Sequence, residues 1–334
     1  MSSSELEQVL DVVYKAILRE TASFNYYYRA GSDHSLPEGV RGLLAKLAEE
    51  ERGHRKMLIS EYTAIQKGWG GTGPGDRGEG SVSYRIPQKP DFLPLTAPEC
   101  MDIRAVSLPA RLVGGDHILT RVADGPGGDE VGMFMTLYDA MGHSLETTGI
   151  NSAAARILGE YLDTTASEEV EREILSPARA VTHLNGEFSG SFQGTGVFLT
   201  LFSGYFDIRN GTLTYTIAGH EPPMLIRGNG KLESLFNTQL IVGIDDQHRY
   251  SESTVPFSPG DTLCLFSDGI LEAQDTYGQF YGRRRLKEAL SGLHGRTAEN
   301  VVSGILDDLR EFCDGEPMHD ELTLAVVGCR KENG

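Results

Sequence analysis

Four aspartates spread over the C-terminal two thirds of the chain share one local pattern. They are Asp116 in LVGGDH, Asp139 in TLYDAMGHS, Asp268 in LFSDGI and Asp320 in MHDELTL. Each lies beside a glycine or at the end of an apolar run, as expected of strand ends and turns where distant side chains converge. A single such aspartate is commonly a turn or cap residue, but four carboxylates without His or Cys partners favour hard divalent ions. Two Mg²⁺ or Mn²⁺ ions about 3.5–4 Å apart can activate water and clamp a phosphoryl group.

A second group of metal-capable side chains, Glu20, Glu51 and His54, lies near the N-terminus. Residues 4–67 are predicted to form two helices, because apolar side chains recur at spacings of three and four. The apolar stripes consist of Val13, Ile17, Phe24 and Tyr27 on the first helix and of Val40, Leu44, Leu47, Leu58 and Ile65 on the second. Glu20 fills a gap in the first stripe, and Glu51 and His54 fall on the second, on one side of the helix. Buried carboxylates need a partner, so this group predicts either a metal site or salt bridges within a dimerisation hairpin.

The elements that position the four aspartates are short strands and helices within residues 98–330. FLTLFSGYFDI, RNG and TLTYTIAGH predict a β-hairpin, and DTLCLFSDGILEA predicts a buried strand that ends at a turn. RTAENVVSGILDDLREFC has the periodicity of an amphipathic helix, and ELTLAVVGC has the pattern of a final strand. We therefore expect an α+β domain with a largely antiparallel sheet. Residues 68–97 begin with a glycine-rich and proline-containing stretch, which predicts a flexible linker after the helices of residues 1–67.

Composition narrows the classes of function. Of 334 residues, 39% are apolar and 23% are charged, which is typical of a globular protein. The net charge is −18, and nearly all of it falls after residue 67. A polyanion of this kind disfavours nucleic-acid binding, because it repels the phosphate backbone. The excess of carboxylates serves either solubility or cation binding. Four scattered cysteines without a CxxC pair indicate a reducing compartment. Since no run of 18 apolar residues and no secretion signal is recognisable, we expect a cytoplasmic protein without a membrane span.

The aspartate segments, their order and their spacing resemble the metal-dependent (PPM-type) protein phosphatases, and most closely the bacterial SpoIIE/RsbU-like branch. The resemblance covers about residues 98–330, and it includes FLTLFSGYFDI, GTLTYTIAGHEPPMLI, SPGDTLCLFSDGILEA and HDELTLAVV. It implies an αββα sandwich, in which helices flank two sheets and two metals lie at one end. It also implies a phosphoserine or phosphothreonine protein as the substrate, such as an anti-sigma-factor antagonist, and hydrolysis without a covalent enzyme intermediate.

The same resemblance assigns catalytic and metal-binding roles to individual residues. Asp116 and Asp139 would hold the two metals, and Asp139 would bridge them. The backbone carbonyl of Ala140 would complete one coordination sphere. Asp268 and Asp320 would complete the second.

Other residues near these segments concern the shape of the site more than its ligands. Gly114 and Gly115 would let the backbone turn tightly beside the metals. Ser144, Glu146 and Glu321 depart from the residues that the family usually has. These departures leave the four ligand positions intact and affect the expected substrate-loop geometry and catalytic rate.

Two histidines and two arginines are further candidates. His143 and His220 each follow a glycine at a turn and could serve as general acids, although such histidines more commonly have a structural role. Arg104 and Arg111 could contact phosphate. The sequence alone leaves these alternatives open.

The N-terminal segments AILRETASFNYYYRA and LLAKLAEEERGHRKML resemble the rubrerythrin-type ferritin-like family. Sites of that kind combine a Glu from each of two helices with a Glu-x-x-His from each of two others, so this chain supplies half a four-helix bundle. The resemblance implies a homodimer in which Glu20, Glu51 and His54 of both chains hold a di-iron centre that regulates the phosphatase. Two alternatives are a catalytically degenerate phosphatase-fold binding module, and a di-iron oxidase or peroxidase in which the phosphatase domain is secondary.

Overall fold

The computed structural model of the chain describes residues 36–66, 85–109, 115–125, 128–141, 146–167, 176–192 and 197–330, with single residues and pairs between Val9 and Gly31. Every described residue between Val9 and Gly31 is helical. Outside the described set lie four residues named above, Arg111, Gly114, His143 and Ser144, and all of residues 68–84 of the predicted linker.

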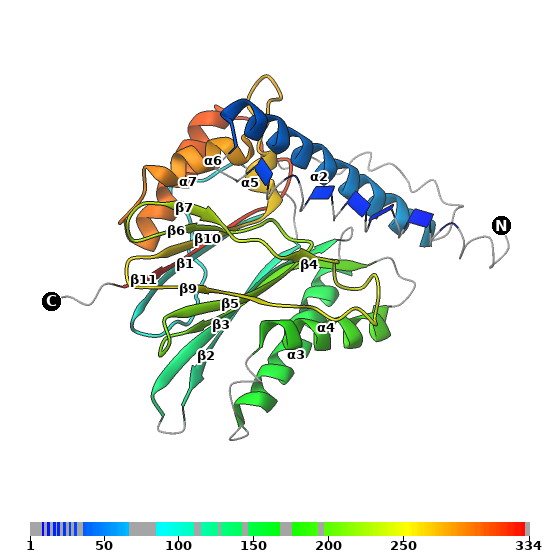
Figure 1. Cartoon of the computed structure of the whole chain (residues 1–334), viewed down its shortest axis with the longest axis vertical. Helices are drawn as coiled ribbons and strands as arrows, with labels where there is room; N and C mark the ends of the chain where they lie inside the picture. The colour runs from blue at the N-terminus through cyan, green and yellow to red at the C-terminus, as the bar shows by residue number, and fades with distance from the viewer. Residues whose placement is uncertain are drawn as a thin grey trace.

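Two mainly antiparallel β-sheets form the centre of the molecule (Figure 1). The first sheet has the strand order β1-β11-β10-β6-β7, and the second has the order β2-β3-β4-β5-β8, with β9 also paired to β5. The first comprises β1 (Met101–Leu108), β6 (Met224–Ile226), β7 (Leu232–Ser234), β10 (Thr262–Phe266) and β11 (Leu322–Cys329). The second comprises β2 (Asp116–Asp124), β3 (Glu130–Met141), β4 (Phe198–Asp207), β5 (Thr212–Ala218), β8 (Thr238–Gln239) and β9 (Ser253–Pro256).

Helices cover the outer face of each sheet, so the domain that contains both sheets has four layers (Figure 1). Over the first sheet lie α5 (Asp268–Glu272), α6 (Gly282–Ser291) and α7 (Ala298–Cys313). Over the second sheet lie α3 (Glu146–Ser167) and α4 (Pro177–Phe192). This arrangement is the predicted αββα sandwich, and the prediction of an α+β fold is confirmed.

The alternation of side chains along the strands explains why both faces of each sheet are buried. On β11, Leu322, Leu324 and Val326 pack with the helices, whereas Ala325 and Val327 pack between the sheets. Strands that are covered on both faces appear in the sequence as nearly continuous apolar runs. The predicted hairpin of β4 and β5, the helix α7 and the last strand β11 are all present.

Residues 85–97, which belong to the predicted linker, pack against the two-sheet domain. Ile86 and Phe92 contact the core beneath α6 and α7, and Leu93 and Leu95 contact the core between the sheets. The amide of Leu93 donates a 2.8 Å hydrogen bond to the carbonyl of Ala105 on β1. This half of the predicted linker is therefore held against the first sheet.

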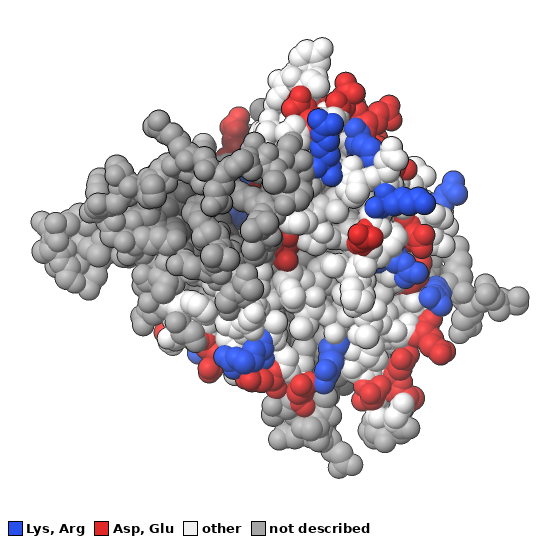
Figure 2. Space-filling model, turned by 180° about the vertical axis from the view of Figure 1, so that it is seen from behind, with Lys and Arg blue, Asp and Glu red and all other residues white. Residues whose placement is uncertain are grey.

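The N-terminal helix α2 (Glu38–Gln66) crosses the two-sheet domain beside α5 and α6 (Figure 1). Seen from behind the view of Figure 1, acidic and basic side chains are interspersed along the described part of the rim, beside a largely uncharged area (Figure 2). Within the described part of the chain, no helix combines the length and the apolar character that crossing a membrane requires.

Candidate active site

Strand pairing places Asp116 and Asp139 directly opposite one another. Asp116 opens β2, Asp139 lies near the end of β3, and the two are cross-strand partners in this antiparallel pair. Such partners have Cβ atoms about 4.5–5.5 Å apart, so two carboxylates share one edge of the second sheet. Gly115 leaves no room for a side chain, since a Cβ there would lie 2.7 Å from Oδ1 of Asp139 and 3.1 Å from the carbonyl oxygen of Ala140.

Asp268 and Asp320 come from the first sheet. Asp268 follows β10 as the first residue of α5, and Asp320 lies just before β11, the antiparallel neighbour of β10. The hydroxyl of Ser267 donates a 3.2 Å hydrogen bond to the carbonyl of Glu321, which ties the two segments together. Gly269 is needed for this close approach, because a Cβ there would lie 2.0 Å from the same carbonyl oxygen.

Burial and mutual repulsion raise the pKa values of the clustered carboxyls. Burial, then Asp268 and Asp320, raise the pKa of Asp139 to about 8. Burial, then Asp139 and Glu321, raise the pKa of Asp116 well above its usual range. Burial and Asp268 also raise the pKa of Asp320. The fold therefore brings all four predicted aspartates close enough to interact electrostatically.

A fifth carboxylate, Glu321, holds the start of β2 in place. Its Oε2 accepts hydrogen bonds from the backbone amides of Gly115 and Asp116, the latter at 3.0 Å. Its Oε1 accepts a 2.8 Å hydrogen bond from the hydroxyl of Ser107. In the sequence, Glu321 stands out only as a departure from the family pattern. Its role was missed, and its place next to Asp320 was the one available signal.

The donor set fits hard divalent cations. Oδ2 of Asp116 is buried, and no donor among the described residues reaches it. A buried carboxylate oxygen without a partner is costly unless a proton or a cation neutralises it. Carboxylate oxygens and a backbone carbonyl are the ligands that Mg²⁺ and Mn²⁺ prefer. Asp116, Asp139, Asp268, Asp320 and the carbonyl of Ala140 would hold the ions, and this assignment stays a prediction.

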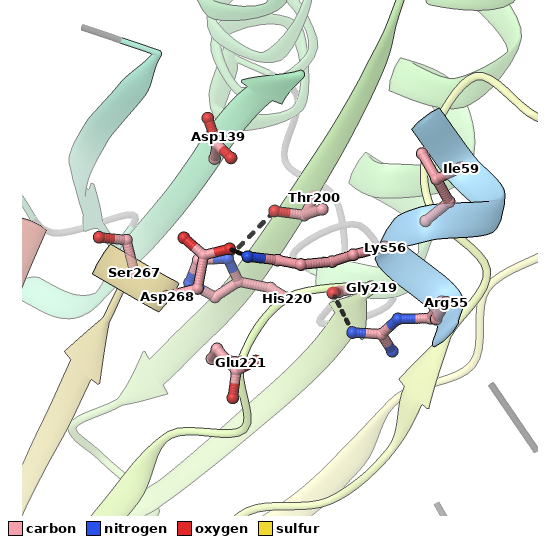
Figure 3. Close-up of a pocket in the computed structure, with 10 residues that line it drawn as sticks. All are labelled: Arg55, Lys56, Ile59, Asp139, Thr200, Gly219, His220, Glu221, Ser267 and Asp268. Atoms are coloured by element: carbon pink, nitrogen blue, oxygen red, sulfur yellow. Dashed lines mark hydrogen bonds and ion pairs between the residues drawn. The ribbon is translucent and has the colours of Figure 1, made fainter. Parts of the chain in front are cut away.

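A basic residue of α2 enters the site. Nζ of Lys56 lies 2.5 Å from Oδ2 of Asp268 and 2.6 Å from Oε1 of Glu272 (Figure 3). Nη1 of Arg52 lies 3.3 Å from Oε1 of Glu272 and 3.5 Å from Oε1 of Glu221. Sequence reasoning did not find these contacts, because they join residues of α2 to residues far along the chain.

The predicted apolar stripe of α2 is only partly buried. Leu44, Leu47 and Leu58 are half-buried, whereas Val40 is 43% exposed, and the side chain of Ile65 lies outside the described set. Among the described side chains of the helix, the fully buried ones are those of Ala48, Arg52, Arg55 and Ile59. The arginines are tolerated on the buried face because acidic side chains and a carbonyl of the catalytic domain pair with them. A search for apolar periodicity could not find this face, since two of its four members are charged.

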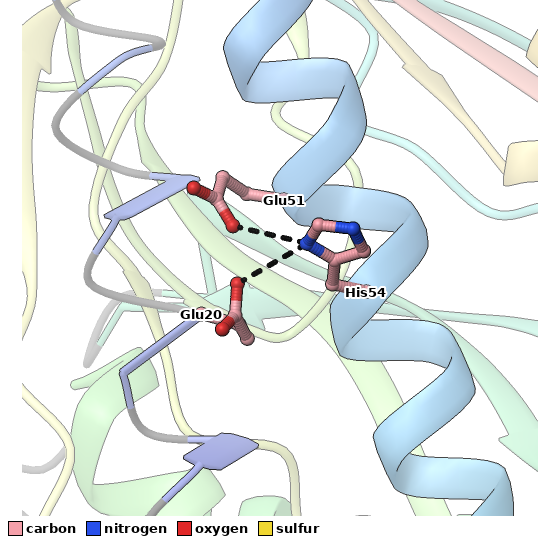
Figure 4. Close-up of side chains that lie close together, drawn as sticks. All are labelled: Glu20, Glu51 and His54. Carbon is pink, nitrogen blue, oxygen red and sulfur yellow. Dashed lines mark ion pairs between the residues drawn. The ribbon is translucent and has the colours of Figure 1, made fainter.

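Glu20, Glu51 and His54 lie together between the N-terminal helices (Figure 4). Nδ1 of His54 is 3.5 Å from Oε2 of Glu51 and 3.7 Å from Oε2 of Glu20. A hydrogen bond with Glu51, with burial as a further cause, raises the pKa of Glu20. The side chain of His54 is 59% exposed, so its predicted place on a buried stripe is wrong. Among the described residues, this is the only group of three or more His, Cys, Asp or Glu side chains whose ligand atoms all lie within 4.8 Å of one another.

The remaining candidates contribute less to the site. His220 is buried, its Nδ1 lies 3.3 Å from Oγ1 of Thr200, and burial lowers its pKa to about 4. The imidazole is therefore neutral near pH 7, which favours the structural role over that of a general acid. The guanidinium of Arg104 lies 3.9 Å from Asp102 and 3.7 Å from Glu299, and neither belongs to the aspartate cluster.

Two facing sheets with helices on both outer faces, and carboxylates from both sheets at one edge, define the class of PP2C-type (PPM) phosphatases. The chain belongs to the Stage II sporulation protein E (SpoIIE) family, whose sequence model matches residues 129–330. That range includes Asp139, Asp268 and Asp320, whereas Asp116 lies before it. The prediction of a phosphatase enzyme is confirmed at the level of this class.

Named relatives support the same assignment. Protein IcfG from Synechocystis is 27% identical over 253 residues, which cover 71% of this chain and 39% of IcfG. Phosphoserine phosphatase RsbU from Bacillus subtilis is 25% identical over 296 residues, which cover 88% of this chain and 81% of RsbU. The chain thus spans well under half of the first relative and about four fifths of the second.

Solved structures show the fold. The SiaA-PP2C domain of Pseudomonas aeruginosa has a TM-score of 0.57 at 18% identity, and the match covers 69% of this chain and 86% of that domain. RsbX, solved in complex with magnesium, has a TM-score of 0.51 at 12% identity, and the match covers 72% of this chain and 98% of RsbX. Both likenesses concern the catalytic domain fold.

Proposed function

We propose that this protein is a cytoplasmic, metal-dependent protein phosphatase that hydrolyses phosphoserine or phosphothreonine on a regulatory protein such as an anti-sigma-factor antagonist. The observation that carries the proposal is the meeting of four aspartates from two sheets, with raised pKa values for Asp116, Asp139 and Asp320. The relation to RsbU, a phosphoserine phosphatase, supports the substrate class. The magnesium complex of RsbX supports the choice of cation.

The carboxylates of this site have two different roles. Asp116, Asp139, Asp268 and Asp320 hold divalent cations, and Glu321 holds the start of β2, where Asp116 lies. When bound, such ions stabilise negative charge on the phosphoryl group and activate water. The carboxylates would keep the ions at the edge of both sheets, where the phosphoryl group of a substrate side chain can align with the attacking water.

The test is phosphate release by the full chain from a phosphoserine protein and from p-nitrophenyl phosphate in the presence of Mn²⁺. We expect metal-dependent turnover that the Asp139→Asn variant loses, while an exposed surface variant such as Asp163→Asn retains it. Equal rates for wild type and Asp139→Asn would instead favour the alternative of a degenerate phosphatase-fold binding module.

We also propose that Glu20, Glu51 and His54 bind a metal, with a di-iron centre forming between two chains as a regulator of the phosphatase. The mutual distances of these three ligand atoms support this proposal. Iron content, oligomeric state and phosphatase rate should change together when the full chain is loaded with Fe²⁺ and oxidised. Equal phosphatase rates for the apo, ferrous and oxidised forms would contradict regulation, and consumption of oxygen or peroxide would favour the oxidase alternative.

A further inference from the structure

We propose that α2 is an autoinhibitory helix, which sets the ammonium of Lys56 on Asp268 in place of a divalent cation and closes the site to a phosphoprotein. This inference rests on the proposed phosphatase function and adds an off-state to it. In this state the helix is bound to the site, and the enzyme turns on when the helix leaves.

The buried face of α2 matches the rim of the active site in charge. Arg52 and Arg55 are 6% and 5% exposed, and charged side chains are rarely buried this far unless they are paired. Arg52 pairs with Glu221 and Glu272, and Arg55 donates a 3.2 Å hydrogen bond to the carbonyl of Gly219. Because breaking a buried pair leaves an uncompensated charge, these contacts stabilise the docked position of α2.

Lys56 competes directly with a cation. Its ammonium lies 2.5 Å from Oδ2 of Asp268, one of the four predicted ligands, and points from α2 into the site (Figure 3). A divalent ion cannot use the same oxygen at the same time, since the ammonium both fills the space and repels positive charge. The docked helix therefore occupies one of the predicted ligand oxygens with an ammonium group.

The space beneath α2 is too small for a substrate. The cavity between Lys56, Ile59, Asp139, His220 and Asp268 measures about 40 Å³. This volume admits about three water molecules. A phosphorylated side chain on a polypeptide needs more room and an open approach, so α2 must move before a phosphoprotein can reach the aspartates.

The helix is connected to the rest of the N-terminal region, through which a signal can act on it. Ile59 packs in one cluster with Ile17 of the first helix and with Phe198 and Ile241 of the catalytic domain. The guanidinium carbon of Arg55 lies 5.1 Å from the ring centroid of Phe24. A displacement of the first helix therefore disturbs the contacts that dock α2.

The test compares Lys56→Gln with Lys46→Gln, which removes an exposed lysine from the same helix. Mn²⁺ affinity is measured on the full chain by calorimetry or electron paramagnetic resonance, with phosphatase rates as a second readout. We expect Lys56→Gln to bind Mn²⁺ between about 5- and 150-fold more tightly, as for a typical coupling between two competing states. Its phosphatase rate at sub-saturating Mn²⁺ should rise, and Lys46→Gln should behave as wild type.

A measurement on the wild-type chain avoids any dependence on the variant. Saturating Mn²⁺ should increase amide hydrogen exchange within residues 48–59, because the helix is displaced. Equal Mn²⁺ affinity for wild type and Lys56→Gln, with unchanged exchange, would overturn autoinhibition while leaving an active phosphatase. A loss of turnover in Lys56→Gln at unchanged affinity would also overturn it and assign Lys56 to substrate binding. Absence of both Mn²⁺ binding and turnover in every form would overturn the proposed function together with this inference.

Discussion

Asp116 and Asp139 face each other as direct cross-strand partners in β2 and β3, so the sheet itself forces two carboxylates together. Like charges in such positions destabilise a sheet, and burial adds to the cost. Cation binding is the simplest chemical explanation for such a destabilising pair. The relationship leads to predictions that separate the stability of the fold from the function of the site.

Asp139→Asn should abolish function and stabilise the metal-free protein. Loss of a predicted bridging ligand should reduce phosphatase turnover by about a thousandfold or more, equivalent to several kcal/mol. In EDTA, the same change removes a buried carboxyl that must either carry a charge near Asp268 and Asp320 or take up a proton, and it should raise the free energy of unfolding by about 1 kcal/mol. Thermal unfolding in EDTA, beside activity assays with Mn²⁺, checks both. A variant that is less stable than wild type without metal would contradict this view of the pair.

The stability of the metal-free protein should fall as the pH rises from about 4 to about 8. The pKa of Asp139 is raised from 3.8 to about 8, so the folded state binds a proton that the unfolded state releases. The stability from this proton is fully present below pH 3.8 and is lost as the pH rises through about 8. Denaturant midpoints in EDTA at about pH 5 and about pH 8 measure the effect.

The difference between wild type and Asp139→Asn measures the contribution of Asp139 to the pH dependence together with its effect on the pKa of Asp116. His220, whose pKa burial lowers to about 4, acts with the opposite sign and is common to both proteins. Saturating Mn²⁺ should remove the fall in stability at high pH. A wild-type protein that gains stability relative to Asp139→Asn over the same pH interval would contradict the raised pKa.

Gly115→Ala should damage the metal site more than the fold. The added methyl group would meet Oδ1 of Asp139 and the carbonyl oxygen of Ala140, both of which belong to the predicted ligand set. We expect at least a tenfold loss of Mn²⁺ affinity, equivalent to about 1.4 kcal/mol. Gly186→Ala on α4 is the matched control, because its added methyl group meets nothing within 4 Å and should not weaken Mn²⁺ binding. Equal Mn²⁺ affinity for both variants would show that the backbone at Gly115 does not shape the site.

Glu221→Gln should destabilise the docked state of α2 strongly. Although burial opposes it, Arg52 and Arg283 lower the pKa of Glu221 to about 2, so this carboxylate is charged at neutral pH. Its removal takes away a carboxylate that two largely buried guanidinium groups, those of Arg52 and Arg283, share. Breaking a buried ion pair on one side typically costs about 3–5 kcal/mol. Chemical denaturation measures this loss. Glu288→Gln, which breaks an exposed pair with Arg284, should change stability by less than about 1 kcal/mol, and an equally small effect of Glu221→Gln would refute the prediction.

The sequence was most informative where strands are buried on both faces. Asp139 and Asp268 follow nearly continuous apolar runs, so the local pattern by itself predicts that both lie at the ends of core strands. Their order, together with Asp116 and Asp320, then predicts a common edge. What strand pairing adds is the register that sets Asp116 against Asp139, which depends on long-range pairing and not on local pattern.

The sequence was least informative about α2. Its apolar stripe predicted a face with Val40 and His54 inside, but the buried face contains Arg52 and Arg55. Charged residues on a buried face become favourable only when a distant surface supplies their partners, and no local pattern reports that surface. The same reasoning applies to Glu321, whose role depends on two amides at the start of β2.

Counting the Mn²⁺ ions that the aspartate cluster holds tests the central claim most directly. The measurement is a Mn²⁺ titration followed by electron paramagnetic resonance, in a full chain carrying His54→Ala so that the N-terminal group does not contribute. We predict that the wild-type site binds two Mn²⁺ ions whose spectra show magnetic coupling, and that Asp139→Asn does not bind both ions. A chain that binds no Mn²⁺, or binds it equally well after Asp139→Asn, would contradict a catalytic site built from these carboxylates.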